Sequence, residues 1–210
     1  MPACQEQKLL IQGAVGQLEI MVNCPKDNPQ PERYAIVCHP NPTHGGAMTN
    51  KVVYMIGSTL NSMGVGVVKF NFRGVGKSEG SFDNGDGERD DLRAVAKWVR
   101  DIYAPTELWL GGFSFGSFVS LRTHHDLNVS RLLLVAPPVQ RFDFSVSDAH
   151  VSDVPTLVIQ GGQDEVVSPE EVKKWIETQT PRPKLVWMED SGHFFHAKLN
   201  DLREEILQHF

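Results

Sequence analysis

The chain has 210 residues, of which 40% are hydrophobic and 22% charged, and its formal net charge is −6. These totals fit one α/β domain over residues 1–210 that buries a substantial core without disulfide or metal staples. The acidic balance argues against a general nucleic-acid binder, which needs cations to neutralise phosphates, and no apolar stretch approaches the length of a membrane span.

The predicted elements begin with two short strands at residues 8–12 and 17–22, separated by a turn that contains Gly13 and Gly16. Together they indicate an antiparallel hairpin at one edge of a sheet. A loop rich in proline, asparagine and aspartate follows at 23–32. The next elements alternate in type: a strand at 34–39, a helix at 49–63, a strand at 65–72 and a helix at 86–102.

The alternation continues with strands at 108–112, 131–136, 156–160 and 184–188, and with helices from about 114, at 169–178 and at 198–210. Strands that alternate with helices predict an α/β fold whose central sheet has about seven to eight strands, is mostly parallel and carries helices on both faces. The strands are continuously apolar, which favours burial on both sides. The longest irregular stretch, 137–154, is too short for a multi-helix lid, so we expect a one-turn helix or a plain loop there.

A serine lies where an apolar strand meets a helix, in the pentapeptide Gly112-Phe113-Ser114-Phe115-Gly116. The pattern G-x-S-x-G at such a junction is typical of a nucleophile elbow, a strained turn that projects the serine hydroxyl above the sheet. Both glycines are required there, because a side chain would collide with the neighbouring strand or helix. The turn also points the N–H of Phe115 at a bound carbonyl oxygen. The pentapeptide alone fits a glycine-rich turn without chemistry equally well, so the rest of the sequence must decide.

A serine nucleophile needs a base, and the base needs an acid that orients it. Asp164 follows the strand at 156–160, and His193 follows the strand at 184–188. Both therefore lie at the carboxyl ends of parallel strands, the edge at which open α/β sheets bind ligands. We interpret Ser114, Asp164 and His193 as a catalytic triad in the chain order serine, acid, histidine.

Each of these assignments has a rival. Asp164 could be a turn residue or helix cap, and Glu165 could be the acid, but Asp164 comes first after the turn and is the better placed of the two. His196 rivals His193, and we expect it to face the surface or to pack locally. We expect the remaining histidines to be exposed or packing residues: His124, His125, His150 and His209.

The second oxyanion donor is expected in the loop after the strand at 34–39. Pro40 and Pro42 have no N–H to donate, which leaves the backbone N–H of Asn41 as the best-placed donor. His39 and His44 could suggest a metal site, but such sites need three or four ligands and no third stands nearby. We therefore expect His39 to shape the loop by hydrogen bonding, and we predict neither a metal nor a cofactor.

Two other runs resemble ligand-binding loops without meeting their requirements. Residues 74–78 end in Gly-Lys-Ser like a phosphate-binding loop, but Asn71 occupies the position of that motif's first glycine. Residues 83–87 are similar to a calcium loop, but glycines stand where ligands are required. We interpret both runs as glycine-rich turns that cap a helix.

The three cysteines, Cys4, Cys24 and Cys38, have neither metal-site nor redox-motif spacing. Such a sparse, odd set predicts a reducing compartment, and Cys38 lies in an apolar run as a small core residue. The segment 1–8 shows no basic start with a hydrophobic region behind it, which disfavours a secretory signal. We therefore expect a cytoplasmic protein.

With these residues in place, the chain resembles the small lidless bacterial serine esterases of the α/β-hydrolase superfamily, in the dienelactone-hydrolase-like group. The resemblance covers nearly the whole chain from about Tyr34 and is carried by residues 39–40, 45–51, 70–78, 112–116, 161–164 and 191–196. It implies acyl-hydrolase activity, with Ser114, Asp164 and His193 matching the triad and Phe115 and Asn41 the oxyanion positions. Dienelactone hydrolase itself uses a cysteine nucleophile, so the serine of this chain favours simple carboxylic esters or thioesters.

The expected reaction is hydrolysis of a small ester or thioester of a short or soluble acyl group through an acyl-enzyme. Phe113, Val166, Phe194 and Phe195 are candidate walls of the acyl pocket, with ordinary core packing as the alternative. A thioesterase or peptidase could use the same triad, and a binding protein could use the same scaffold. No nucleic-acid or membrane partner is expected, and a monomer and a homodimer both remain open.

Overall fold

The structure is a computed structural model that describes residues 3–210. Its first two strands, β1 (Gln7–Gln12) and β2 (Gln17–Asn23), pair antiparallel as the predicted hairpin. The remaining strands of the described chain are β3 (Arg33–Cys38), β4 (Gly66–Phe70), β5 (Glu107–Phe113), β6 (Arg131–Val135), β7 (Thr156–Gly161) and β8 (Lys184–Met188).

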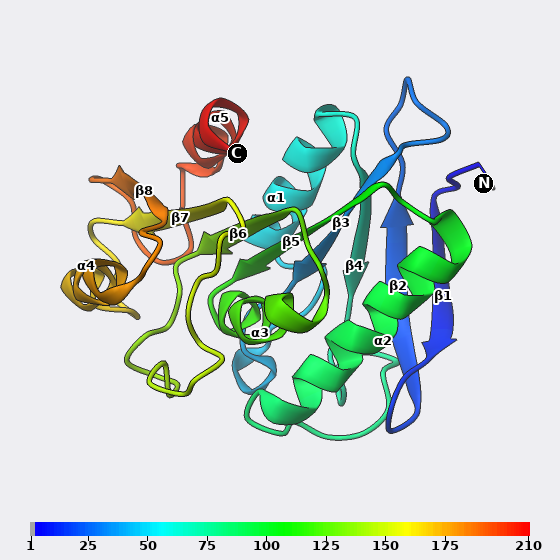
Figure 1. Ribbon diagram of the computed structural model, residues 1–210, viewed down its shortest axis with the longest axis horizontal. Helices are drawn as coiled ribbons and strands as arrows, with labels where there is room; N and C mark the ends of the chain where they lie inside the picture. The colour runs from blue at the N-terminus through cyan, green and yellow to red at the C-terminus, as the bar shows by residue number, and fades with distance from the viewer. Residues whose placement is uncertain (1–2) are drawn as a thin grey trace.

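All of these strands join one sheet in the order β1-β2-β4-β3-β5-β6-β7-β8 (Figure 1). β2 pairs antiparallel with β4, and every pair from β4 to β8 is parallel. The predicted fold class, a mostly parallel sheet with an antiparallel N-terminal edge, is confirmed. Because β3 to β8 run in one direction, the loops after β3, β5, β7 and β8 open at the same edge of the sheet.

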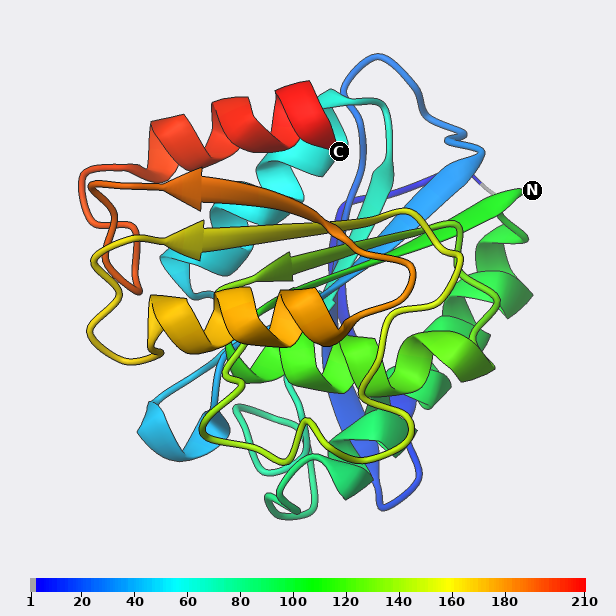
Figure 2. The same ribbon diagram turned by 60° about the vertical axis from the view of Figure 1, so that its left-hand side comes forward.

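Two layers of helices cover the sheet. The helices are α1 (Lys51–Ser62), α2 (Asp86–Tyr103), α3 (Phe115–Thr123), α4 (Pro169–Thr178) and α5 (Leu199–His209). Figure 2 shows α1 and α5, in cyan and red, on one face of the strands, and α2, α3 and α4 on the other. Each layer buries its own apolar cluster against the sheet, which is why the parallel strands are apolar on both sides.

Side-chain caps begin two of these helices, α1 and α4. The Asn50 carboxamide accepts the N–H groups of Val52 and Val53 at the start of α1. Ser168 accepts the N–H of Glu171 at the start of α4. Such caps satisfy backbone donors that have no partner inside the helix, so they fix the first turn.

The two runs that resemble ligand-binding loops, residues 74–78 and 83–87, are turns, and only the second of them caps a helix. Glu88 is fully buried and its carboxylate accepts the N–H groups of Asp83 and Gly85, which caps α2. Ser78, at the end of the other run, donates its hydroxyl to the carbonyl of Asn71 at 2.6 Å. Both loops therefore use their polar groups to hold the backbone.

The segment between β6 and β7 has turns and bends but no helix in the described chain, so of the two expected forms, a one-turn helix or a plain loop, it is the plain loop. Two contacts fix it beside α4. The Gln140 carboxamide accepts the N–H of Ser168 at 3.1 Å, and the Arg141 guanidinium donates to the carbonyl of Val166. The carboxyl edge of the sheet is therefore not covered by a helical lid.

Cys4 and Cys24 form a disulfide, with their Cα atoms 5.7 Å apart. The bond was not predicted, because the three sparse cysteines were interpreted as a sign of a reducing compartment. The hairpin explains it, because antiparallel pairing places Gln7 opposite Val22 and so brings the residues just outside both strands together. Met1 and Pro2, which open the segment without a signal pattern, lie outside the described residues. None of the helices at residues 3–210 has the length and apolar character needed to cross a membrane.

Candidate active site

Ser114 lies in a strained turn between β5 and α3. Its backbone has φ 51° and ψ −121°, a conformation that residues with a side chain rarely adopt. Two groups hold the turn: Ser114 donates its N–H to the carbonyl of Val135 at 2.8 Å, and Ser117 donates its hydroxyl to the carbonyl of Ser114 at 2.6 Å. The hydroxyl of Ser114 is thereby presented at the carboxyl edge of the sheet.

The glycines around Ser114 allow this turn because backbones approach closely on both sides. A Cβ atom at Gly112 would lie 2.3 Å from the carbonyl oxygen of Gly116, and a Cβ atom at Gly116 would lie 2.3 Å from that of Cys38. Real Cβ contacts are never that short, so any larger residue would push α3 away from β3 and β5. The G-x-S-x-G pattern is thus explained by packing at both of its ends.

The three residues interpreted as a triad meet at this edge. The Nε2 atom of His193 lies 3.1 Å from the Oγ atom of Ser114, and its Nδ1 atom lies 2.8 Å from the Oδ2 atom of Asp164. The three side chains come from the ends of β5, β7 and β8, and each residue is at most 8% exposed. A neutral imidazole with its proton on Nδ1 can donate to Asp164 and accept the serine proton on Nε2.

The Asp164 carboxylate is held by a ring of donors. Its Oδ1 atom accepts the N–H groups of Val166 at 2.9 Å and Val167 at 2.7 Å, and its Oδ2 atom accepts the side-chain amide of Gln160 at 3.0 Å. Burial alone would raise the pKa of Asp164. The hydrogen bond and the charge of His193, together with the two backbone donors, outweigh the effect of burial. The pKa of Asp164 therefore lies below its usual value.

The loop that carries His193 is fixed by the rival acid. Glu165 does not reach the imidazole; its Oε2 atom accepts the backbone N–H of His193 at 3.1 Å. The His193 ring packs between Phe113 and Phe194, with ring centroids 5.1 and 5.0 Å away. His196 is exposed, as expected.

His39 shapes the loop after β3. It is fully buried, its Nε2 atom accepts the N–H of Phe72 at 3.0 Å, and its Nδ1 atom donates to the carbonyl of Pro40 at 2.7 Å. Burial lowers the pKa of His39 to about 4, so the ring is neutral at pH 7 and can fill both roles. The predicted hydrogen-bonding role of His39 matches these contacts.

The two backbone groups proposed as oxyanion donors have no protein partner among residues 3–210. Phe115 is the first residue of α3, where backbone N–H groups have no partner inside the helix. Asn41 lies on the wall of the same cavity as Ser114, and its side chain is turned back to accept the N–H and hydroxyl of Thr43. Both N–H groups are therefore free to bind a ligand.

A cavity of about 590 Å³ opens in front of Ser114 and His193. Of the four candidate wall residues, Val166 and Phe194 line it. Phe113 and Phe195 are fully buried and belong to the apolar cluster beneath α1 and α5. The remaining wall residues come mainly from the loop after β3, the segment before α2 and the loop after β6: Pro40, Asn41, Thr43, His44, Gly45, Gly46, Asn50, Phe82, Asn84, Pro138, Arg141, Phe142 and Val167.

Sequence reasoning missed Gln160 and Arg141. Gln160 is a fully buried carboxamide at the end of β7 that contacts Asp164, and Arg141 is the cation on the cavity wall. A polar residue closing the apolar run Leu157-Val158-Ile159 was a usable signal for Gln160, because buried polar groups need a partner. Nothing in the irregular stretch 137–154 marks Arg141 before the loop is folded.

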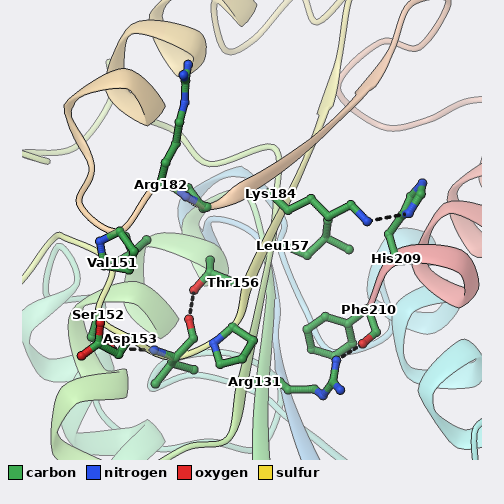
Figure 3. A pocket seen from close by; sticks show the side chains of 14 residues that line it. Arg131, Val151, Ser152, Asp153, Thr156, Leu157, Arg182, Lys184, His209 and Phe210 are labelled. Atoms are coloured by element: carbon green, nitrogen blue, oxygen red, sulfur yellow. Dashed lines mark hydrogen bonds between the residues drawn. The ribbon is translucent and has the colours of Figure 1, made fainter.

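A second cavity, of about 300 Å³, lies at the opposite edge of the sheet, where β6, β7 and β8 begin (Figure 3). Its cations have partners within the protein. Arg131 donates to the carbonyl of Phe210, Lys184 donates to the Nδ1 atom of His209, and Arg182, which extends away from the others, lies 3.7 Å from the carboxylate of Glu177. None of the predicted site residues lines this cavity.

Comparison with known proteins gives three kinds of match. The α/β-hydrolase domain family matches residues 41–207. The structure of an α/β serine hydrolase without a lid from Xanthomonas campestris is 49% identical, with a TM-score of 0.89 over 97% of this chain and 93% of that one. An α-β serine hydrolase homologue from Coxiella burnetii is 44% identical, with a TM-score of 0.91 over 96% of both chains. An uncharacterised protein of Rickettsia prowazekii is 34% identical over 82% of this chain and 76% of its own length.

Proposed function

The chain belongs to the α/β-hydrolase family, and we propose that it is a serine hydrolase that cleaves carboxylic esters of short or soluble acyl groups. The observation that carries the proposal is the unbroken series of contacts from Asp164 through His193 to Ser114 in a strained turn. These are the groups that a hydroxyl nucleophile needs, in the geometry that lets a proton leave it.

In the first half of the proposed reaction, the Oγ atom of Ser114 attacks the ester carbonyl while Nε2 of His193 takes its proton. Asp164 remains ionised, holds the imidazole with its proton on Nδ1, and stabilises the imidazolium that forms. The backbone N–H groups of Phe115 and Asn41 bind the oxyanion of the tetrahedral intermediate. When the intermediate collapses, His193 donates its proton to the departing alcohol, which leaves an acyl-Ser114.

The second half returns the enzyme to its starting state. Water enters in place of the alcohol, and His193 takes one of its protons as the oxygen attacks the acyl carbonyl. The second tetrahedral intermediate collapses with return of that proton to Ser114 Oγ, and the carboxylic acid is released. Because the loop after β6 forms no helical lid, the cavity admits soluble substrates, and we expect no activation at lipid interfaces.

Labelling and turnover together test this proposal. A fluorophosphonate probe should label the folded wild-type protein at Ser114, and a panel of p-nitrophenyl esters and acyl thioesters ranked by kcat/KM should place short-chain esters first. Faster turnover of thioesters would make the protein a thioesterase with the same triad. A folded protein that neither labels nor turns over any member of the panel would contradict the proposal and favour a binding role on a hydrolase scaffold.

A further inference from the structure

Arg141 is a charged group of the cavity that no acid neutralises. Apart from imidazoles, it is the one ionisable side chain among the described residues that line the cavity, and no aspartate or glutamate lines it. Its guanidinium makes no ion pair in the described chain. Its Nε and Nη2 atoms donate to the carbonyl of Val166 at 3.3 and 3.2 Å, and a carbonyl leaves the positive charge in place.

The position of Arg141 is fixed relative to the proposed triad. Val166 accepts a hydrogen bond from the guanidinium on its carbonyl, and it also donates its N–H to Asp164. The neighbouring Gln140 accepts the N–H of Ser168, so the same loop is attached at two successive residues. The guanidinium is therefore tied to the turn that holds the acid of the triad.

Several other arginines of this acidic protein are paired with aspartates. Arg73 pairs with the buried Asp91 at 2.8 Å, and Arg122 pairs with Asp148 at 2.7 Å. Arg141 differs from them in facing a cavity with an uncompensated charge. In a chain whose net charge is −6, such a group makes the cavity a local attractor for anions.

We propose, on the basis of the proposed function, that the substrate is an ester that carries a carboxylate and that Arg141 binds this carboxylate. A guanidinium presents two parallel donors that match the two oxygens of a carboxylate. A single cation suits a monoanionic carboxylate better than a phosphate monoester, which carries close to two charges at pH 7. Phe82, Phe142 and Phe194 on the cavity wall fit an apolar body between the ester and the carboxylate.

Matched ester pairs test the substrate class. Each pair consists of an ester with a free carboxylate and its neutral primary amide of the same length, with the extra group on the acyl side in one pair and on the alcohol side in the other. The wild-type protein should prefer the anionic member of at least one pair, and added salt should weaken the preference. In Arg141→Gln, kcat/KM for that anionic member should fall about 10- to 100-fold while its neutral partner is unaffected.

Arg182→Gln is the control, because Arg182 is an exposed arginine at the second cavity, and it should change neither rate. Equal effects of Arg141→Gln on both members of every pair, or the absence of any effect, would overturn the carboxylate proposal while the serine hydrolase stands. Failure of the wild-type protein to hydrolyse any ester or to label at Ser114 would instead remove the proposed function on which this inference rests.

A separate observation concerns Gln160 on β7. Its Nε2 atom donates to the Oδ2 atom of Asp164 at 3.0 Å and to the carbonyl of Gly161 at 3.1 Å. Both partners are acceptors, so the amide nitrogen must face them. The Oε1 atom is consequently directed elsewhere, and it is a buried oxygen without a hydrogen-bond partner in the described chain. A buried oxygen without a hydrogen-bond partner costs free energy. We therefore expect the amide nitrogen of the same side chain to have a role that offsets this cost.

The geometry points to Gln160 as a positioning residue for the Asp164–His193 pair. The oxygen that it contacts, Oδ2, is the one that accepts the imidazole N–H, whereas Oδ1 is occupied by the two backbone donors. Gln160 therefore fixes the rotation of the carboxylate about its last bond and aims one oxygen at His193. It also shares that oxygen's charge, which helps to keep Asp164 ionised.

Replacing Gln160 with methionine tests this role, because methionine has a similar length and no amide. Once Asp164 has lost a donor, its carboxylate stabilises the protonated imidazole more strongly, so the acidic limb of the kcat/KM profile should move to higher pH by about 0.5 to 1 unit. The value of kcat should fall about 10-fold with KM little changed. The NMR signal of the His193 Nδ1 proton should shift as well, and this readout does not depend on turnover.

Gln179→Met is the matched control, since Gln179 is another buried glutamine whose carboxamide holds a loop away from the site, through the N–H of Val151. It should lower stability without moving the pH profile or the imidazole signal. If Gln160→Met folds and leaves both readouts unchanged, the positioning role is wrong. A shifted Nδ1 signal in a protein without esterase activity would support the positioning role while removing the proposed function.

Discussion

Residues 3–210 contain two serine–histidine contacts, which differ in the second group that each imidazole contacts. His193 lies 3.1 Å from the Ser114 hydroxyl at the carboxyl edge of the sheet, and His124 lies 2.9 Å from the Ser152 hydroxyl beside the second cavity. Both histidines are buried. By distance alone, Ser152 would be the better candidate, so proximity of serine and histidine does not distinguish a catalytic site.

The second partner of each ring separates the two pairs. The Nδ1 atom of His193 faces the carboxylate of Asp164, whereas that of His124 faces the backbone carbonyl of Leu121. Burial, together with neighbouring His125 and His150, lowers the pKa of His124 to about 4, which makes it a weak base at neutral pH. A serine–histidine contact therefore becomes a candidate catalytic site only where a carboxylate, a strained turn and free N–H groups accompany it.

Replacing each of the two serines with alanine should give the largest difference in turnover between two variants. Ser114→Ala should lower kcat by about 10⁴- to 10⁶-fold and abolish fluorophosphonate labelling, because the triad acts as a unit. Ser152→Ala removes an equally close hydroxyl and should leave both readouts near those of the wild-type protein. The measurement is ester turnover with labelling in parallel. Loss of labelling in Ser152→Ala, or its survival in Ser114→Ala, would place the nucleophile elsewhere.

Asp164→Asn would make the environment of His193 resemble that of His124 by replacing the carboxylate with a neutral group. The asparagine oxygen would accept the N–H groups of Val166 and Val167, and its NH₂ would then face the imidazole. The ring would be forced to carry its proton on Nε2, where it cannot accept one from Ser114. We expect kcat to fall about 10³- to 10⁴-fold with folding preserved. Near-normal turnover would show that Asp164 is only a structural cap, and Glu165→Gln then tests the rival acid.

Asn41→Pro would remove the backbone N–H proposed as the second oxyanion donor, which belongs to the wall of the cavity in front of Ser114. Proline removes the backbone N–H, and the φ of −51° at Asn41 suits its ring. The variant also loses the side-chain contact with Thr43, so Asn41→Ala, which loses only that contact, is the reference. Turnover of Asn41→Pro should be about 10²- to 10³-fold below that of Asn41→Ala. Equal rates in the two variants would exclude this N–H as an oxyanion donor.

The comparison also shows what the sequence can and cannot predict. Ser114, Asp164 and His193 could be placed at one edge because each follows an apolar strand, and parallel strands bring such ends together. Their neighbours were harder to predict. Phe113 and Phe194 are both aromatic and adjacent to triad residues, yet Phe113 is fully buried and Phe194 is 40% exposed at the cavity. The direction of a side chain within a tight turn depends on backbone angles that residue type does not reveal.

The contact between His124 and Ser152 could not be predicted from the sequence either. His124 was expected to be a packing or exposed residue, and nothing in the sequence connects it with Ser152, which is 28 positions away. The Cys4–Cys24 bond was missed for a similar reason, since it depends on the register of the hairpin. The succession of strands and helices along the chain can be inferred from pattern, whereas contacts between loops require the folded backbone.

The smallest effect expected is a loss of stability in mild acid, and it involves the histidines and not Asp164. Burial holds the pKa of His39, like that of His124, at about 4, against 6.5 in an unfolded chain. Between these values the unfolded chain binds more protons, so the free energy of unfolding falls as the pH drops from about 6.5 toward 4. The pKa of Asp164 is lowered, so its contribution is present above pH 3.8 and is lost only below it. For His39 we expect a loss on the order of 2 kcal/mol between pH 7 and pH 5.

Urea unfolding at pH 7 and pH 5 measures this loss. His124→Gln removes one of the two imidazoles whose pKa is lowered by burial, so the difference in unfolding free energy between the two pH values should be smaller in the variant than in the wild-type protein. Ester turnover of the variant at pH 7 should stay near the wild-type rate, because His124 has no role in the proposed reaction. A wild-type protein equally stable at both pH values would mean that neither ring is kept neutral by burial. The assignment of His124 as a weak base would then lose its physical ground.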